Sequence, residues 1–386
     1  MLQYKNKKSI SGIARMAANP LYKLNAVKKT SDSLIISGDN FSAMSCLLAG
    51  GYAEKIDLCY IDPPFLTDNV FTFTGERVRT ISNSKRGEIA YEDRFKREEY
   101  FEFMRERLVL IHKLLSPCGS LYLHIDSKIG HYLKVLLDEI FGEDNFLNEI
   151  TRIKGNPKNF HRRAYGNEKD VIYFYAKDKS QNIWNDIKVE CSENELSKNF
   201  AKTTPDGRRY TTVPVHAPGE CSGATGGLWR DMLPPQGRHW RTAPAELDKL
   251  DALGLIEWSS NGNPRLMKFA DEHKGKKIQD VWLDFKDPLY PEYPTQKNAQ
   301  MLELIVQQSS NENSLVLDAF AGSGGFLKAA QKFGRKFIAI DKGEKAVQLL
   351  KESLLQGSID DQPQYIDLRK VGIDYECMDT EKRLVS

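Results

Sequence analysis

Short apolar runs that end at an aspartate or a glycine recur along this chain and alternate with segments of helical periodicity. The runs SLIIS, KIDLCYI and GSLYLHI end immediately before Gly38, Asp62 and Asp126, and such uniform apolarity is typical of strands buried on both faces. Between them, apolar residues recur every three or four positions over 100–115 and 129–140, as on one face of a helix. Strands that alternate with helices predict an α/β fold with a mostly parallel sheet.

This alternation stops after the apolar run VIYFYA (171–176) and resumes near residue 281. In between, Gly, Pro, Trp, Arg and His become frequent and apolar periodicity fades, which predicts an inserted module. A helix over 298–308, the strand SLVLD, a glycine-rich turn and the strand KFIAI then continue the α/β pattern. We expect the following parts: a basic N-terminal arm (1–30), two halves of one α/β domain (31–180 and 281–345), the insert (181–280), and a C-terminal helix and tail (346–386).

Composition and cysteine placement restrict the class of protein. Forty per cent of the residues are hydrophobic, which excludes a disordered, collagen-like or coiled-coil chain. No apolar run approaches the roughly 18 residues that cross a bilayer, and no secretion signal opens the chain. The six cysteines form no CxxC pair, so neither a disulfide framework nor a metal site is indicated. These features predict a soluble cytoplasmic protein without a membrane partner or a metal.

The first of two loops suited to chemistry is DAFAGSGG, residues 318–325. Gly322 and Gly324 allow a tight turn and a close approach of the backbone to a ligand, next to the positive end of a helix. Asp341 ends the following strand and is placed to accept hydrogen bonds from a ribose diol. A dinucleotide fingerprint would need glycine where Leu327 stands. A nucleoside ligand without a pyrophosphate therefore fits better than a nicotinamide or flavin cofactor.

The second loop is the tetrad Asp62-Pro63-Pro64-Phe65, directly after the strand KIDLCYI. Its two prolines remove two N–H donors and stiffen the turn. The Asp62 carboxylate and the Pro63 carbonyl can then accept hydrogen bonds, while the Phe65 ring offers a stacking surface. Such a site suits a planar base with an amino group, whose nitrogen would be held in the pyramidal geometry that makes its lone pair nucleophilic. The alternative interpretation is a simple strand-ending turn.

Taken together and in this order, the two loops resemble those of the amino-methylating, S-adenosylmethionine-dependent DNA methyltransferases with the permuted (β-type) motif order. The resemblance extends over most of residues 33–345 and implies a circularly permuted Rossmann-like methyltransferase fold with an inserted target-recognition module. The segments that carry it are SGDN (37–40), CYIDPPFLT (59–67), YEDRF (91–95), SPCGSLYLHID (116–126), LLDEIFGEDNFLNEI (136–150), YPTQKN (293–298), VLDAFAGSGGF (316–326) and FIAID (337–341).

This resemblance also implies roles for individual residues. In the family, the acid at the position of Asp39 contacts the cofactor adenine, the acid at Asp341 takes the ribose, and the tetrad binds the extruded base. The residues so assigned are Asp62, Pro63, Pro64 and Phe65 for catalysis, and Asp39, Thr295, Lys297, Asp318, Phe320, Gly322, Ser323, Gly324 and Asp341 for the cofactor. Proline usually follows the Lys297 position, and Asn298 stands there instead; asparagine can cap the same helix.

The implied activity is site-specific transfer of a methyl group from S-adenosylmethionine to N6 of a flipped-out adenine in double-stranded DNA. Aspartate at the first tetrad position goes with adenine in this family, and serine goes with N4 of cytosine. Methylation of N4 of cytosine, a modification subunit active only with a partner, and a DNA-binding subunit with a vestigial core are the alternatives. The family resemblance to adenine-specific modification methylases of restriction-modification systems allows a restriction subunit, a cognate endonuclease or a second copy of the chain as partners.

Three other classes of methyltransferase fit less well. Pro117-Cys118 is similar to the nucleophilic dipeptide of cytosine-C5 methyltransferases, but it lies upstream of the glycine loop, the reverse of that family's order. Protein-glutamine and RNA methyltransferases use a related proline-rich turn, generally with the glycine loop preceding it. The motif order and the inserted module therefore favour DNA as the substrate.

A flipped-out base requires a grip on the DNA backbone, and basic side chains provide it. One group of candidates lies in a run without acids, and the other lies in the insert. They are Arg152, Lys154, Lys158, His161, Arg162 and Arg163 in the run, and Arg208, Arg209, Arg230, Arg238 and Arg241 in the insert. A solvated basic face is the alternative for such residues.

Overall fold

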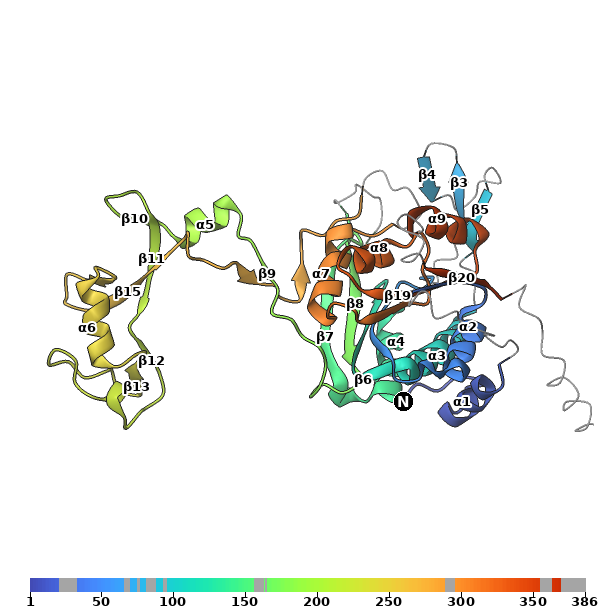
Figure 1. Ribbon diagram of the computed structural model, residues 1–386, viewed down its shortest axis with the longest axis horizontal. Coiled ribbons are helices and arrows are strands. Elements are labelled where there is room, and N and C mark those ends of the chain that lie inside the picture. Colours follow the sequence, from blue (N-terminus) through green and yellow to red (C-terminus); the bar gives the residue numbers. More distant parts are fainter. Residues whose placement is uncertain are drawn as a thin grey trace, which may run out of the picture. The chain divides into compact units, whose positions relative to one another are not determined.

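The computed structural model describes residues 1–20, 33–65, 70–74, 77–80, 88–92, 96–155, 163, 165–288, 296–354 and 363–368. The chain divides into two compact units. The large unit consists of Met1–Ile187 and Gln279–Ser386, and the insert consists of Lys188–Ile278. Figure 1 shows the elements of both units in the colours of the sequence.

A nine-stranded sheet forms the centre of the large unit, in the order β17-β7-β8-β6-β2-β18-β19-β1-β20. Neighbouring strands are parallel except at β8, which is antiparallel to both β6 and β7. This sheet confirms the expected α/β fold. Its strands are β1 (Leu34–Ser37), β2 (Ile56–Ile61), β6 (Leu115–Ile125), β7 (Phe146–Ile153), β8 (Lys169–Ala176), β17 (Val281–Trp282), β18 (Leu315–Asp318), β19 (Lys336–Asp341) and β20 (Gln364–Asp367).

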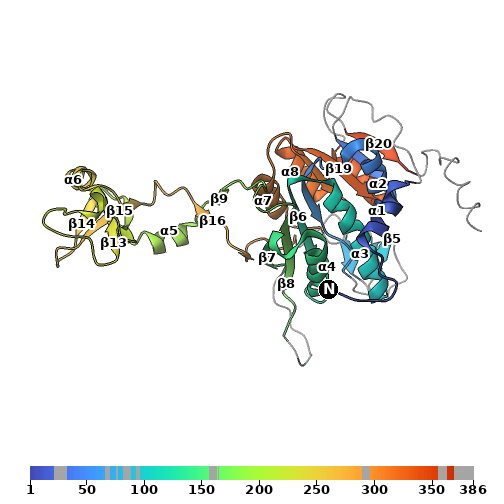
Figure 2. The same cartoon turned by 90° about the horizontal axis from the view of Figure 1, so that it is seen from below.

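Helices cover both faces of this sheet. On one face α1 (Ile10–Ala18), α2 (Asn40–Leu47), α3 (Arg97–Leu114) and α4 (Gly130–Phe141) pack against one another. On the other face α7 (Ala299–Ser309) packs against α8 (Gly325–Lys332), which contacts α9 (Glu344–Leu354) (Figures 1 and 2). Other short elements of this unit are a π-helical turn (Leu48–Tyr52), a 3-10 turn (Glu143–Asn145) and a small sheet of β3 (Val70–Thr74), β4 (Arg77–Thr80) and β5 (Glu88–Glu92).

The ends of two helices follow from their flanking residues. Helix α4 ends at Gly142, whose φ of +87° suits glycine. Helix α7 begins after Asn298, whose side chain accepts a hydrogen bond of 3.1 Å from the Met301 N–H. The asparagine therefore caps the helix as expected.

Strands β18 and β2 lie side by side at the middle of the sheet, and the chain leaves them in opposite directions. From β18 it passes through α8 to β19, and from β2 it passes through α3 to β6 on the other side. Val316 pairs with Leu58 and Leu317 with Cys59, so both strands end at the same edge. This is the topological switch point at which α/β proteins bind ligands.

The first 20 residues of the basic arm belong to the large unit and pack against its other helices. Helix α1 buries Ile13 and Ala17 and contacts α2 and α3. Lys7 forms an ion pair of 2.7 Å with Glu139 of α4. The sequence pattern indicated the positive charge of this arm but gave no sign of its acidic partners on the helices.

The insert is built from short strands around a small aromatic core. An antiparallel sheet has the order β10-β11-β15-β14, and Trp229 and Trp240 pack edge to face with ring centroids 5.7 Å apart. Their indole N–H groups donate to Asp248 and to the Gly227 carbonyl. The elements of the insert are β9 (Lys188–Val189), α5 (Glu193–Asn199), β10 (Lys202–Thr203), β11 (Arg209–Pro214), β12 (His216–Pro218), a 3-10 turn (Ala224–Gly226), β13 (Arg238–Trp240), α6 (Pro244–Ala252), β14 (Ile256–Trp258), β15 (Pro264–Phe269) and β16 (Lys276–Lys277). Across the described ranges of both units, no helix has the length and apolarity to cross a membrane.

Candidate active site

The Asp62 carboxylate directly follows β2 and uses its two oxygens differently. Oδ2 forms an ion pair of 2.7 Å with the Nζ of Lys297, whose side chain is only 7% exposed. Oδ1 is buried and has no hydrogen-bond partner among the described residues. Burying a carboxylate oxygen without a donor is unfavourable. The second oxygen of Asp62 is therefore an acceptor suited to a donor from outside the chain.

The rest of the tetrad is fixed by its surroundings. The Tyr100 hydroxyl donates a hydrogen bond of 2.7 Å to the Pro64 carbonyl, and Pro63 is buried. The Phe65 ring is partly buried, and the Lys297 ammonium lies 4.9 Å from its centroid. Lys297 was assigned to the cofactor by family resemblance, and the structure places it against both Asp62 and Phe65.

A buried polar cluster lies behind the tetrad. The His124 ring, fully buried, lies 6.1 Å from the Phe65 ring. Its Nδ1 is 2.9 Å from the Tyr60 hydroxyl, and its Nε2 is 3.4 Å from Asp170. Burial and the nearby Lys297 ammonium lower the pKa of His124. Arg152 Nη1 also lies 3.4 Å from Nε2, so a neutral imidazole can either donate to Asp170 or accept from Arg152 there.

Arg152 and Lys154 belong to the same cluster. Arg152 is fully buried, pairs with Asp287 and donates a hydrogen bond of 3.1 Å to the Phe285 carbonyl. Lys154 pairs with Asp170 at 2.7 Å. The expectation that Arg152 contacts phosphate is therefore wrong, because its guanidinium does not reach the surface. Of the other candidates in this run, Arg163 is exposed, and Lys158, His161 and Arg162 lie outside the described residues.

The glycine loop after β18 is held by two aspartates. Asp341 accepts hydrogen bonds of 2.8 Å from the backbone N–H groups of Gly322 and Gly343, and Asp318 accepts one of 2.9 Å from the Phe320 N–H. Burial raises the pKa of both aspartates, and the charges of Asp62 and Asp341 raise that of Asp318 further. Three carboxylates thus meet at the ends of β2, β18 and β19.

Gly324, at the start of α8, shows why this loop needs glycine. Its φ is +80°, and a Cβ there would lie 2.6 Å from the buried side chain of Leu350. Ser323 is partly buried in the same turn. Thr295, the remaining predicted cofactor residue of this half of the chain, lies outside the described residues.

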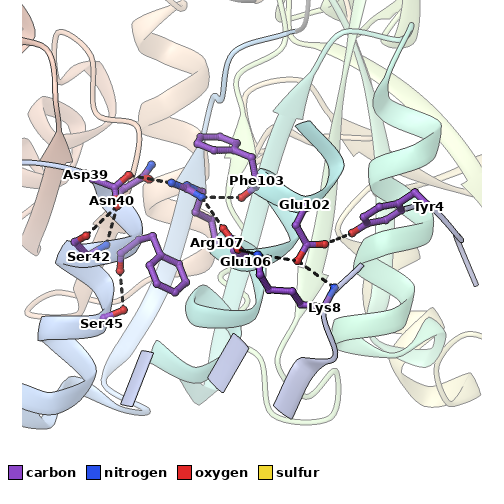
Figure 3. Close-up of polar contacts among 11 residues, drawn as sticks. Tyr4, Lys8, Asp39, Asn40, Ser42, Ser45, Glu102, Phe103, Glu106 and Arg107 are labelled. Atoms are coloured by element: carbon purple, nitrogen blue, oxygen red, sulfur yellow. Dashed lines mark hydrogen bonds and ion pairs between the residues drawn. The ribbon is translucent and has the colours of Figure 1, made fainter. Parts of the chain in front are cut away.

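Asp39, after β1, and its neighbour Asn40 both contact Arg107 (Figure 3). The Asp39 side chain caps α2 by accepting from the Ser42 N–H, and it accepts a hydrogen bond of 2.9 Å from Arg107. Asn40 donates to the Ala319 carbonyl and accepts from Arg107. Half of the Asp39 side chain is exposed. Arg107 was not predicted as a site residue, because nothing in the sequence of its helix indicates that it contacts Asp39 after folding.

Three of the five predicted arginines of the insert form ion pairs within the insert. Arg208 pairs with Asp271 and Glu272, Arg209 pairs with Glu193, and Arg230 pairs with Asp248 and Asp251. Arg238 and Arg241 have no acidic partner within ion-pair distance among the described residues.

Comparison with known proteins defines the class. A family model described as DNA methylase (N6_N4_Mtase) matches residues 56–352, and the chain therefore belongs to this family of DNA methylases. The resemblance seen in the motifs is confirmed.

Individual relatives fit this assignment. The chain is 41% identical over 312 residues to the type II methyltransferase M.EcaI of Enterobacter cloacae, covering 80% of this chain and 66% of the relative. It is 26% identical over 334 residues to the StyLTI Mod subunit, a type III restriction-modification enzyme of Salmonella typhimurium, covering 78% of this chain and 50% of the relative. The chain thus spans two thirds or less of these two relatives. A solved complex of M1.HpyAVI with SAM aligns with a TM-score of 0.45 and 18% identity, covering 83% of this chain and 98% of that one.

We expect Arg152→Met to lower the free energy of unfolding by about 2–3 kcal/mol, because it leaves Asp287 and the Phe285 carbonyl without their donor. The value is below that of a fully buried pair, since the Asp287 side chain is 30% exposed. Arg163→Met, at an exposed position of the same run, should change stability by less than about 0.5 kcal/mol. Urea unfolding followed by circular dichroism measures both, and equal losses in the two variants would contradict the structural role of Arg152.

Proposed function

We propose that this chain is an S-adenosylmethionine-dependent DNA methyltransferase that methylates N6 of an adenine flipped out of double-stranded DNA. The observation that carries the proposal is the meeting of the Asp62 tetrad and the glycine loop at one switch point. Asp62 presents a buried oxygen without a donor there, and family membership supports DNA methylation. The first residue of the tetrad is an aspartate, which in the family that the motifs resemble goes with adenine as the target base.

The glycine loop fits a nucleoside that carries a sulfonium. The carboxylates of Asp62, Asp318 and Asp341 create a negative surrounding, which favours a cation. We assign the ribose hydroxyls to Asp341. Asp39 accepts three hydrogen bonds in the structure, and a carboxylate has about four acceptor positions, so one remains for the adenine amino group. When bound, the cofactor supplies an activated methyl group.

The tetrad positions the target amino group for direct transfer. Lys297 holds Oδ2 of Asp62 and so fixes the rotation of the carboxylate, with Oδ1 turned to accept an amino hydrogen. Phe65 provides the stacking surface, and Pro63 supplies the second acceptor. The residues of the chain orient the nitrogen for attack, and no covalent intermediate with the protein is needed.

Incubation with isotope-labelled S-adenosylmethionine and unmodified bacterial DNA, followed by digestion to nucleosides and mass spectrometry, tests the reaction. We expect label on N6-methyladenine. Label on N4-methylcytosine would retain the reaction class and overturn the choice of base. Absence of both label and cofactor binding would contradict the proposal.

Asp62→Asn should lower the rate of transfer by about 10²- to 10³-fold and weaken cofactor binding much less, because Asp318 and Asp341 still face the cofactor. Lys297 would keep the amide oxygen, so the amide NH₂ would face the base amino group, donor against donor. Asp57→Asn on the same strand, where Asp57 accepts from Ser116, is the matched control and should keep its activity. Equal losses of activity in the two variants would refute a specific role for Asp62.

Cofactor binding should release protons, and affinity should rise with pH. Burial raises the pKa of Asp318 in the free protein, and a bound cation favours the ionised carboxylate, so this pKa falls on binding. Calorimetry in two buffers of different ionisation enthalpy gives the number of protons released. Asp318→Asn, which keeps an acceptor for the Phe320 N–H, should reduce that number and weaken binding. Unchanged proton release in the variant would exclude Asp318 as the source.

The insert is proposed as the target-recognition region, with its DNA contacts centred on strand β13. Arg238 and Arg241 have no acidic partner among the described residues; the Arg238 side chain contacts His216, and that of Arg241 donates to the Pro214 carbonyl. Burial, Arg238, Arg241 and Arg265 together lower the pKa of His216, as expected in a positive surrounding.

Phosphate contact is also proposed for the other basic candidates. Three of them must first exchange an acidic partner, namely Lys154, Arg208 and Arg209. The full set is Lys154, Lys158, Arg162, Arg163, Arg208 and Arg209.

The double variant Arg238→Gln/Arg241→Gln should bind duplex DNA more weakly and reduce the slope of log affinity against log salt by about 2, one unit for each lost phosphate contact. Arg208→Gln/Arg209→Gln removes the same charge from acid-paired positions and should change the slope less. Fluorescence anisotropy over a range of salt concentrations measures both. A larger change in the second variant would overturn this assignment.

The protein partners that we propose are a restriction subunit, a cognate endonuclease or a second copy of the chain. Relatives named as Mod subunits of type III restriction-modification enzymes support the first of these.

A further inference from the structure

A chain of charged side chains links the N-terminal segment to Asp39 (Figure 3). Lys8 Nζ lies 2.5 Å from Glu106 Oε1. The other oxygen of Glu106 lies 3.4 Å from Arg107 Nη1, and Arg107 Nη2 lies 2.9 Å from Asp39 Oδ1. Glu106 is therefore shared between two cations, and Arg107 is shared between two carboxylates.

Several further contacts keep Lys8 on α3. The Tyr4 hydroxyl donates a hydrogen bond of 2.7 Å to Glu102, and the backbone N–H of Lys8 donates one of 3.3 Å to the same carboxylate. Arg105 donates to the Lys8 carbonyl. The segment before α1 is thus attached to one face of α3 by side-chain and backbone contacts, which places the Lys8 ammonium beside Glu106.

The Arg107 guanidinium is held in place by its surroundings, and the contacts that can change are those with Asp39 and Glu106. Its guanidinium lies 3.6 Å from the centroid of the Phe103 ring and donates to the Phe103 carbonyl. The Arg107 side chain is 7% exposed, and that of Glu106 is 16% exposed. At such low exposure the solvent screens these charges weakly, so the balance between the two carboxylates depends on their other partners.

We propose that Lys8 is a positioning residue for cofactor binding: by pairing with Glu106, it leaves Arg107 to hold Asp39. Without Lys8, Arg107 is the remaining cation within ion-pair distance of Glu106 among the described residues, and Glu106 draws it away from Asp39. Asp39 would then lose the donor that fixes its Oδ1 and would present the adenine contact less well. This inference rests on the proposed function, since it concerns the binding of S-adenosylmethionine at Asp39.

The test compares cofactor affinity in three variants of the full chain by isothermal titration with S-adenosylmethionine. Lys8→Met should weaken binding about three- to five-fold, the size expected for a partly exposed ion pair. Lys8→Met/Glu106→Gln should restore the affinity, because the competing charge is gone. Lys7→Met is the matched control, since Lys7 lies in the same segment and pairs with Glu139 on α4.

A merely structural role for the segment predicts a different pattern. The Lys7 side chain is 11% exposed and that of Lys8 is 40% exposed, so Lys7→Met should lower the melting temperature at least as much as Lys8→Met. If affinity falls in parallel with melting temperature in both variants, or if Glu106→Gln fails to restore it, the inference is wrong. Failure of the wild-type chain to bind S-adenosylmethionine would instead refute the proposed function.

Discussion

The pairing of β2 with β18 is the contact on which the rest of this molecule depends. It joins residues that are far apart in the sequence, Leu58 to Val316 and Cys59 to Leu317. The entropy lost in closing so long a loop grows only with the logarithm of its length, whereas each paired strand satisfies its buried backbone groups and removes apolar side chains from water. One strand pair therefore sets both the centre of the sheet and the place where the Asp62 tetrad meets the glycine loop.

The same edge of the sheet concentrates charges that a stable core would avoid. Burial raises the pKa of Asp318 and of Asp341. Oδ1 of Asp62 has no hydrogen-bond donor among the described residues. Among the residues that the structure describes, Lys297 is the direct cationic partner of Asp62. A binding site that must receive a cation and an amino group needs unsatisfied acceptors in advance, so the unfavourable desolvation belongs to the proposed function and is offset when the ligands bind.

Sequence patterns predicted the parts of the fold in which local signals agree with the tertiary structure. Strands β1, β2, β6, β8, β18 and β19 each contain a continuous apolar run, and α3, α4 and α7 have one apolar face. The missed elements lack such signals. Strand β7 mixes exposed and buried positions, and β20 is a four-residue edge strand with a polar first residue. The insert has tryptophans at its core and strands too short for periodicity to show.

The sequence predicted the parts of the site that lie in a motif, namely the tetrad and the glycine loop. It did not predict ion pairs between residues that are far apart in the sequence. The run after residue 151 has no acid in sequence, yet Arg152 pairs with Asp287 and Lys154 with Asp170. Lys8 and Arg107 meet through Glu106 in the same way. Local net charge therefore says little about which cations are available to a phosphate. We therefore propose phosphate contact for Arg238 in β13 and for Arg241 directly after it, which have no acidic partner among the described residues.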